Sequence, residues 1–136
     1  MRQAMFIILV LLILQIDKTE IINHFKETVQ VLSADKMMGR SSLRPEIWQA
    51  ARYIHQEFEK IGLSKLDNGS FYQRFTRPEG QEIANVIGYH LASSKTNKSL
   101  IFVAHYDGLG IGKANAEGDS IYNGAVDNAV GVAALS

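Results

Sequence analysis

The stretch that most constrains the fold of this chain is a short apolar run that ends abruptly in polar residues. Residues 100–104 read Leu-Ile-Phe-Val-Ala and are followed at once by His105, Tyr106 and Asp107. The run is short, contains β-branched residues and is bounded by glycine-rich sequence, which predicts a buried strand of a largely parallel sheet. The carboxyl ends of such strands carry chemistry, so the polar residues after the run are candidate site residues.

His105 and Asp107 are separated by a single residue. Because side chains alternate along extended backbone, both project to the same side if the extended conformation continues through Tyr106. A carboxylate beside an imidazole accepts the proton of one ring nitrogen and leaves the other nitrogen free to bind a metal. Beyond a glycine-punctuated loop, Asp127 adds a second carboxylate just before the small-residue run 128–135, which predicts the first turns of a helix.

Each of these two pieces has a simpler interpretation when it is taken alone. A lone His-x-Asp is more often a turn histidine beside an acid than a metal site, and Asp127 followed by Asn128 is also a favoured start of a helix. The two pieces become informative because they occur in order, one at a predicted strand end and the other at a predicted helix start.

Together the two segments resemble the secreted zinc aminopeptidases that use two co-catalytic metals. The resemblance rests on residues 101–107 (IFVAHYD) and 123–131 (NGAVDNAVG), with further similarity at 32–40 (LSADKMMGR) and 85–88 (NVIG), and it extends over residues 20–136. It implies that His105 is a zinc ligand, that Asp107 orients this histidine, and that Asp127 bridges two zinc ions. It also implies a hydrolase that removes amino-terminal residues from peptides with a free amino terminus.

Composition limits the other function classes. The chain has 136 residues, a formal net charge of zero and no cysteine. This length suits one domain or part of one, and the scattered lysines and arginines give no reason to expect nucleic acid as a partner. The absence of cysteine excludes disulfides and thiolate zinc sites, so any zinc must be bound by histidine and carboxylates.

Residues 1–16 differ in character from the rest of the chain. Met1-Arg2-Gln3 carries one positive charge, and residues 4–14 form an uninterrupted apolar run whose length fits a signal peptide better than a bilayer span. No small-x-small cleavage pattern follows, so a retained amino-terminal anchor and an interior hydrophobic helix stay open as alternatives. We therefore expect a secreted or periplasmic protein that contacts a membrane only through such an anchor.

The remaining residues predict an α/β domain. Apolar residues at helical spacing predict helices over 17–33 and 47–61, and β-rich runs predict strands at 71–75 and 83–91. We expect residues 17–136 to form the amino-terminal part of a zinc-peptidase domain, an incomplete zinc-exopeptidase fold with helices flanking a mixed, mostly parallel sheet. The other histidines are not expected to be ligands: His24 has no partner ligand at helical spacing, we expect His55 to be solvated, and His90 lacks an acidic neighbour two residues away.

The resemblance also implies residues that this sequence does not contain. In the family, a pair of adjacent glutamates follows the bridging aspartate; the first is the general base and the second a zinc ligand, and a further aspartate and histidine complete the metal sites. No Glu-Glu pair follows Asp127. We therefore expect the amino-terminal portion of a larger zinc-dependent aminopeptidase, inactive as this fragment.

Three alternatives remain open at this point. One is a glutaminyl-peptide cyclotransferase-like acyltransferase with a single zinc; Asp127-Asn128, where those enzymes tend to have Asp-Ser, argues against it. Another is a non-catalytic, receptor-type ectodomain of the same fold, and the presence of both His105 and Asp127 argues against that. The third is a small binding module.

Overall fold

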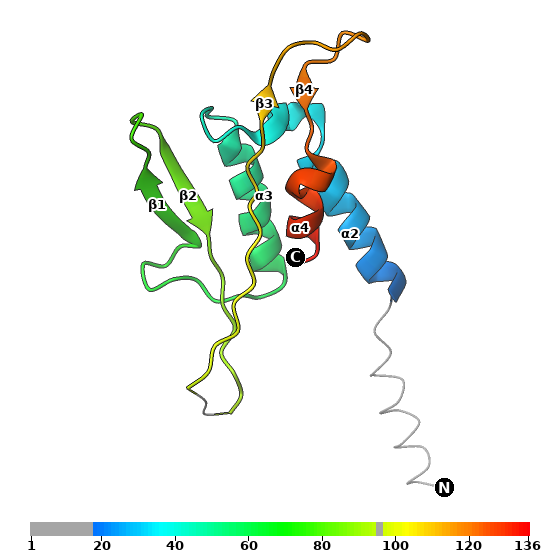
Figure 1. Cartoon of the computed structure of the whole chain (residues 1–136). Coiled ribbons are helices and arrows are strands. Elements are labelled where there is room, and N and C mark those ends of the chain that lie inside the picture. Colours follow the sequence, from blue (N-terminus) through cyan, green and yellow to red (C-terminus); the bar gives the residue numbers. More distant parts are fainter. Residues whose placement is uncertain (1–17, 95–96) are drawn as a thin grey trace, which may run out of the picture.

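The described part of the chain, residues 18–94 and 97–136, combines helices with two small sheets in the computed structural model. Its elements in chain order are α2 (Lys18–Leu32), η1 (Asp35–Arg40), α3 (Ile47–Lys60), β1 (Tyr72–Thr76), β2 (Glu82–Val86), β3 (Gly110–Ile111), β4 (Ile121–Tyr122), η2 (Ala125–Ala129) and α4 (Val130–Ala133). Helices α2, α3 and α4 gather at the centre of Figure 1, with the β1–β2 hairpin beside α3 and the β3–β4 hairpin at the top. The expected α/β class is confirmed.

The predicted signal peptide or anchor at residues 1–16 lies outside the described residues. Within residues 18–94 and 97–136, no helix combines the length and the apolar character that crossing a bilayer requires. The location of the protein therefore stays a prediction.

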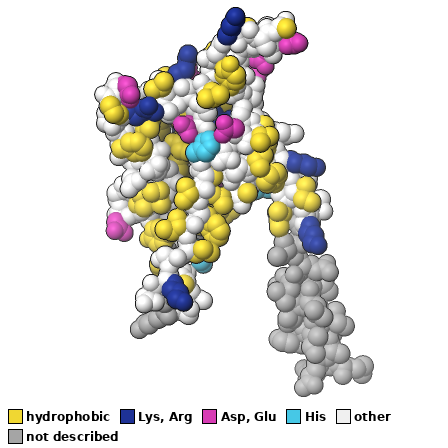
Figure 2. All heavy atoms as spheres, in the orientation of Figure 1, with side chains coloured by type: hydrophobic (Ala, Val, Ile, Leu, Met, Phe, Trp, Pro, Cys, Tyr) yellow, Lys and Arg dark blue, Asp and Glu magenta, His cyan; other side chains and the backbone are white. Residues whose placement is uncertain are grey.

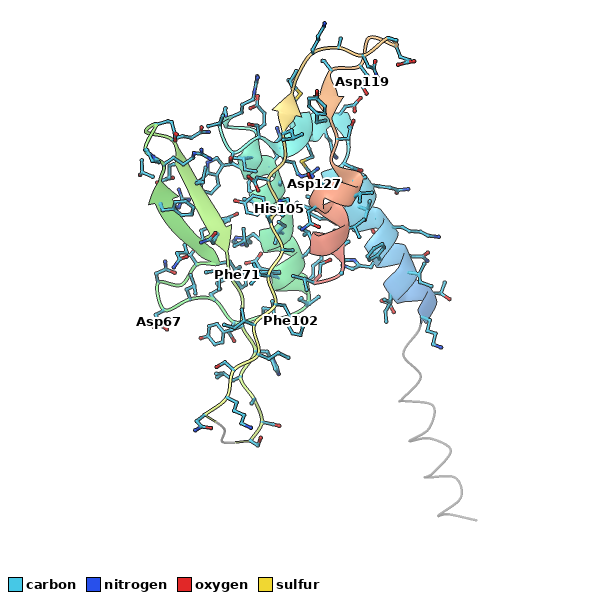
Figure 3. All side chains as sticks on the ribbon, in the orientation of Figure 1. Asp67, Phe71, Phe102, His105, Asp119 and Asp127 are labelled. Atoms are coloured by element: carbon cyan, nitrogen blue, oxygen red, sulfur yellow. The ribbon has the colours of Figure 1, made fainter. Side chains whose placement is uncertain are left out.

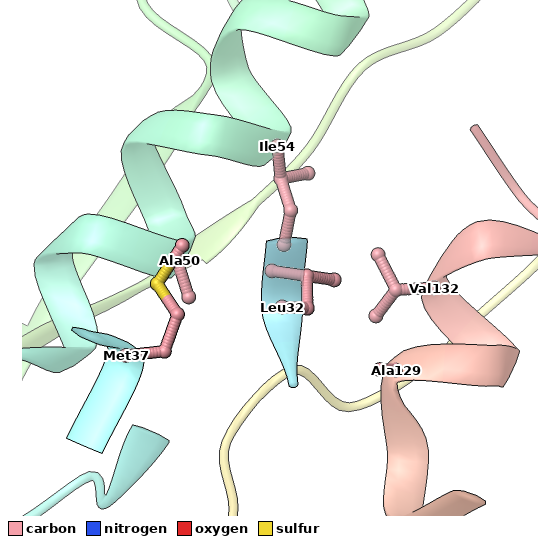
Figure 4. Packing of buried hydrophobic residues seen from close by; sticks show 6 residues of the cluster. All are labelled: Leu32, Met37, Ala50, Ile54, Ala129 and Val132. Atoms are coloured by element: carbon pink, nitrogen blue, oxygen red, sulfur yellow. The ribbon is translucent and has the colours of Figure 1, made fainter. Parts of the chain in front are cut away.

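The hydrophobic core lies where α2, α3 and α4 meet, as Figure 4 shows. The two long helices predicted from apolar spacing are both confirmed, as α2 and α3. Each contributes apolar residues from one side of the helix to the core, as helical spacing predicts, although Ile22 in the first half of α2 is 51% exposed. The buried cluster consists of Leu32, Met37, Ala50, Ile54, Ala129 and Val132.

The predicted strands at 71–75 and 83–91 correspond to β1 and β2, which pair antiparallel. The second strand is shorter than predicted, because β2 ends at Val86. Their register places Tyr72 opposite Val86 and Thr76 opposite Glu82. Phe71, at the start of the hairpin, is fully buried and fixes the hairpin against α3, where its ring meets that of Phe58 edge to face at a centroid separation of 5.7 Å.

The prediction of a buried strand at residues 100–104 is wrong. Leu100, Ile101, Phe102 and Val103 are 70–85% exposed, and no backbone hydrogen bond joins residues 100–104 to another segment in the described part of the chain. Phe102 lies on an extended segment that runs below the helices in Figure 3. Composition predicted the extended conformation, but a strand also needs neighbouring strands, and the described residues supply none. The expected mostly parallel sheet is likewise not seen there, since both sheets are antiparallel pairs.

Past Val103 the chain returns to the core. Ala104 and Tyr106 pack against the core cluster, and the Tyr106 hydroxyl donates a hydrogen bond of 2.5 Å to the carbonyl oxygen of Ala84 in β2. This bond fastens residues 104–107 to the β1–β2 hairpin. The segment therefore has a fixed position although it belongs to no sheet.

The glycine-rich segment after Asp107 turns into the β3–β4 hairpin and passes very close to η1. A Cβ placed on Gly39 would lie 2.6 Å from the Cα of Gly110, and Gly39 has a left-handed φ of +66°. The backbone amide of Gly108 donates to the carbonyl oxygen of Arg40 at 2.9 Å. Glycines are needed here because two backbones touch.

We predict that Gly39→Ala destabilises the fold more than Gly62→Ala does. Gly62 also has a left-handed φ, of +74°, but nothing lies within 4 Å of a Cβ placed there. Both variants should incur the backbone strain of about 1–2 kcal/mol, and Gly39→Ala should lose a further 1–3 kcal/mol, roughly, from overpacking. Urea unfolding followed by Trp48 fluorescence measures the difference, and equal losses would contradict the close approach.

A second prediction concerns the bond between Tyr106 and Ala84. Burial raises the pKa of the Tyr106 hydroxyl to about 12, and the Asp107 carboxylate adds to the rise. Because an unfolded tyrosine has a pKa of about 10, this group's contribution to stability is present below about pH 10 and is lost between about pH 10 and 12. Tyr106→Phe should lower the free energy of unfolding by about 1–2 kcal/mol at neutral pH.

The loss caused by Tyr106→Phe should then shrink as the pH rises above about 10, since only the wild type can ionise at this position. Unfolding in urea at a series of pH values measures this loss. A loss that stays constant through this range would show that the hydroxyl has an ordinary pKa.

Candidate metal centre

His105 and Asp107 lie on the outer side of the segment whose inner side packs on the core. Ala104 and Tyr106 face inward, so the alternation expected of extended backbone places the two intervening positions together on the other face. His105 Nδ1 is 3.3 Å from Asp107 Oδ1 and 3.2 Å from the backbone oxygen of the same residue. An acceptor thus sits beside one ring nitrogen, as the sequence predicted.

Asp127 approaches the other ring nitrogen from a distant part of the chain. Its Oδ1 is 3.2 Å from His105 Nε2, and Figure 3 shows the two side chains side by side between the extended segment and the last helical turns. The side chains of His105, Asp107 and Asp127 are 54%, 47% and 74% exposed. In Figure 2 a histidine is visible between acidic side chains on this face, so an ion or a substrate can reach the group from solvent.

The pair formed by His105 Nε2 and Asp127 Oδ1 fits one edge of a zinc coordination shell. Two ligands bound tetrahedrally at about 2.0–2.2 Å are themselves about 3.3–3.5 Å apart, close to the 3.2 Å found here. Histidine and carboxylate are also ligand types that zinc accepts. Within residues 18–94 and 97–136, however, no group of three or more such side chains is placed to hold an ion together.

The loop that carries Asp127 is anchored at its start and its end. Asn123 donates through its side-chain nitrogen to the carbonyl oxygen of Ser33 and to Asp35 Oδ1, both at 2.7 Å. At the other end, Asn128 Oδ1 accepts a hydrogen bond of 3.1 Å from the amide of Gly131 in the last helix. The predicted helix after Asp127 is confirmed as α4, although its regular part starts only at Val130.

Between these anchors the backbone turns sharply. Gly124 has a left-handed φ of +62°, and a Cβ at this position would lie 2.7 Å from Nη2 of Arg40. Asp127 and Asn128 depart from helical geometry inside η2, and the peptide bond between them is cis. Within this loop the Asp127 carboxylate lies beside the His105 ring.

Behind the two loops lies the guanidinium of Arg40, whose side chain is completely buried. It donates to the backbone oxygen of Tyr106 in the first loop and to those of Asn123, Gly124 and Asp127 in the second. Burial lowers the pKa of Arg40, and the carboxylates of Asp107 and Asp127 oppose this shift. A buried arginine therefore connects the two segments that carry the candidate ligands.

No pattern in the sequence indicates a role for Arg40 or Asn123. Arg40 appeared only as the end of the 32–40 segment, and Asn123 only as the start of the 123–131 segment. The one local signal was an arginine directly after Gly39, and a single Gly-Arg pair is too common to indicate a buried cation. Apart from Leu32, which is close to Arg40 in sequence, their partners here are 66–90 residues away.

Comparison with known proteins points to the carboxyl-terminal part of the chain. Residues 85–136 match the family model of Peptidase family M28. A search of curated proteins and a search of solved structures each gave no match. The matched segment contains His105, Asp107 and Asp127 but starts well after Arg40. The match supports a peptidase-type function, of a family whose members are generally zinc-dependent, for the segment that forms the candidate metal centre.

Proposed function

We propose that this chain provides metal-binding residues of a zinc-dependent aminopeptidase acting on peptides with a free amino terminus. The observation that carries the proposal is the separation of 3.2 Å between His105 Nε2 and Asp127 Oδ1, within the segment matched by the peptidase family. Two residues that are 22 positions apart in sequence thus present donor atoms at the spacing of ligands on one ion.

Each side chain has a distinct task in this proposal. His105 binds zinc through Nε2, because its Nδ1 faces Asp107. Asp107 accepts the Nδ1 proton, which fixes the tautomer and the ring orientation. Asp127 binds through its carboxylate, which is exposed enough to offer its second oxygen to another ion in a two-zinc centre.

Zinc supplies Lewis-acid polarisation of the substrate carbonyl and makes water nucleophilic near neutral pH. The chain's own residues hold and orient the ion, and their exposure leaves the ion open to a peptide. Catalytic zinc normally has three protein ligands, whereas the described residues bring together two. We therefore expect weak zinc binding and no turnover from this 136-residue chain alone.

The proposed location rests on the amino-terminal sequence. A secreted or periplasmic protein, with residues 1–16 removed or retained as an anchor, agrees with the apolar run at residues 4–14. Fractionation of source cells together with the intact mass of the native protein tests this. An unprocessed form in the cytoplasm would contradict it.

Zinc binding by the purified chain tests the site residues. His105→Ala and Asp127→Ala should each abolish measurable binding, because each removes one of the two ligands that the described residues bring together. Asp107→Ala should weaken binding by about 10–100-fold, as loss of a partner behind a ligand typically does. The control is His90→Ala, which removes an exposed histidine outside this centre and should leave binding unchanged.

Competition with a chromophoric chelator measures all four affinities, with circular dichroism to show that each variant folds. A larger loss with Asp107→Ala than with Asp127→Ala would reverse the assigned roles. Wild-type chain that binds no zinc would refute the metal centre.

The reaction is tested on the protein as its source cell produces it. We expect release of the amino-terminal residue from an aminoacyl chromogenic substrate, loss of this activity with a chelator, and recovery with zinc. An N-acetylated substrate should not react, because the proposed enzyme requires a free amino terminus. Cyclisation of an amino-terminal glutamine with release of ammonia would instead indicate the acyltransferase, and zinc binding without either reaction would indicate a non-catalytic domain.

A further inference from the structure

The completely buried Arg40 is a charged group that the proposed function does not use. Burying an unpaired charge is very costly, so a buried guanidinium persists only where its donors are satisfied. A guanidinium has five N–H donors, and Arg40 has five acceptors, all of them backbone carbonyl oxygens. The match in number indicates that the surroundings are built around this side chain.

The five carbonyl oxygens come from three separate segments. Nε donates to Tyr106 at 2.9 Å, and Nη1 donates to Leu32 and, at 2.7 Å, to Asn123. Nη2 donates to Gly124 at 2.8 Å and more distantly to Asp127 at 3.4 Å. Arg40 thus joins the carboxyl end of α2, the segment that carries His105 and the loop that carries Asp127.

Two of the five contacts are made to a candidate ligand or to its neighbour in sequence. Tyr106 is the residue next to His105 in sequence, and Asp127 is itself a ligand candidate whose backbone oxygen receives the longest of the five bonds. The main chain of Arg40 adds a further tie, because its carbonyl oxygen accepts the amide of Gly108. Any shift of one loop relative to the other therefore breaks bonds to Arg40.

The backbone at Arg40 is itself strained. Met38 and Arg40 have left-handed φ values of 52° and 53°, which side chains other than glycine rarely adopt. Such strain persists only where the surrounding structure over-determines it, and it gathers at functional sites. Here the strained turn is what brings the guanidinium between the two loops.

We propose that Arg40 is the positioning residue of the metal centre, setting the spacing between His105 and Asp127 by binding the backbone of both loops. This inference rests on the proposed function, because it assumes that these two side chains bind zinc. Arg40 does not touch the ion. It acts by holding the two ligands at a separation that one ion can span.

The test compares Arg40→Lys with two control variants of the full chain. Lysine keeps the positive charge but offers three donors from a single atom, so it cannot reproduce the planar fork that spans three segments. Arg52→Lys makes the same change at an exposed arginine of α3. Ile54→Val weakens the core without touching the guanidinium, so it shows what lower stability alone does to zinc binding.

Arg40→Lys should bind zinc about 10–100-fold more weakly than wild type, whereas Arg52→Lys and Ile54→Val should bind it with wild-type affinity. Affinities are compared for the folded protein, with the folded fraction measured by circular dichroism. Unchanged zinc affinity in folded Arg40→Lys would overturn the proposal. So would a loss of zinc affinity in Ile54→Val as large as that in Arg40→Lys, when the two variants are equally stable.

Wild-type chain labelled with ¹⁵N in arginine provides a measurement that does not depend on a variant folding. The Nε–H signal of Arg40 should be protected from exchange with solvent and should shift when zinc is added. An Nε–H chemical shift that stays unchanged at saturating zinc would overturn the positioning role.

A failure of the proposed function gives a different pattern. If wild type binds no zinc, the metal centre is refuted. The connection that Arg40 makes between the two loops can still be measured without metal. In that case Arg40→Lys should speed hydrogen exchange at the amides of Gly108 and Ala129, which bond to Arg40 and Gly124, and Arg52→Lys should not. Unchanged exchange at both amides would show that Arg40 does not hold the loops.

Discussion

A single buried guanidinium connects the parts of this chain that matter for its chemistry. Arg40 is bonded to the end of α2, to the segment after residue 104 and to the loop before Asp127. Its acceptors are all backbone carbonyl oxygens, so the buried cation is satisfied by the main chain of the segments that it joins. The face of the molecule that carries His105 is assembled on this contact.

The two faces of the segment 104–107 have different roles: one packs on the core and the other carries candidate site residues. Ala104 and Tyr106 are held by the core and by the bond to Ala84, which leaves His105 and Asp107 on the open face. The rigid inner side fixes the position of the histidine ring. The outer side stays accessible, which a centre that handles a peptide requires.

Much of this arrangement could be predicted from local sequence pattern. The stripes of α2 and α3 and the alternation at His105 and Asp107 are short-range properties, and both appear in the structure. The prediction of a strand at 100–104 was wrong for a physical reason. Strand pairing depends on the neighbouring segments and not on the apolar run itself. Apolar, β-branched composition predicts what a segment can do when a partner is present, and it does not provide the partner.

The role of Arg40 was beyond the reach of sequence reasoning. All five of its acceptors are backbone carbonyl oxygens, which every residue carries, so no side-chain pattern marks them. The family match also begins at residue 85, long after Arg40. The position of the guanidinium is visible only in the folded chain. A left-handed turn at Met38–Arg40 places it between two loops that lie more than 60 residues later in the sequence.

In the proposed metal centre, the backbone around Arg40 presents His105 and Asp127 to one zinc ion. Crystals of the chain grown with zinc, with anomalous diffraction recorded on both sides of the zinc absorption edge, test it most directly. We expect a peak bonded to His105 Nε2 and to the Asp127 carboxylate, with the guanidinium of Arg40 still bonded to both loops. A peak at another pair instead, such as His24 with Glu57 or His55 with Glu59, which also lie within 4 Å of each other, would contradict it.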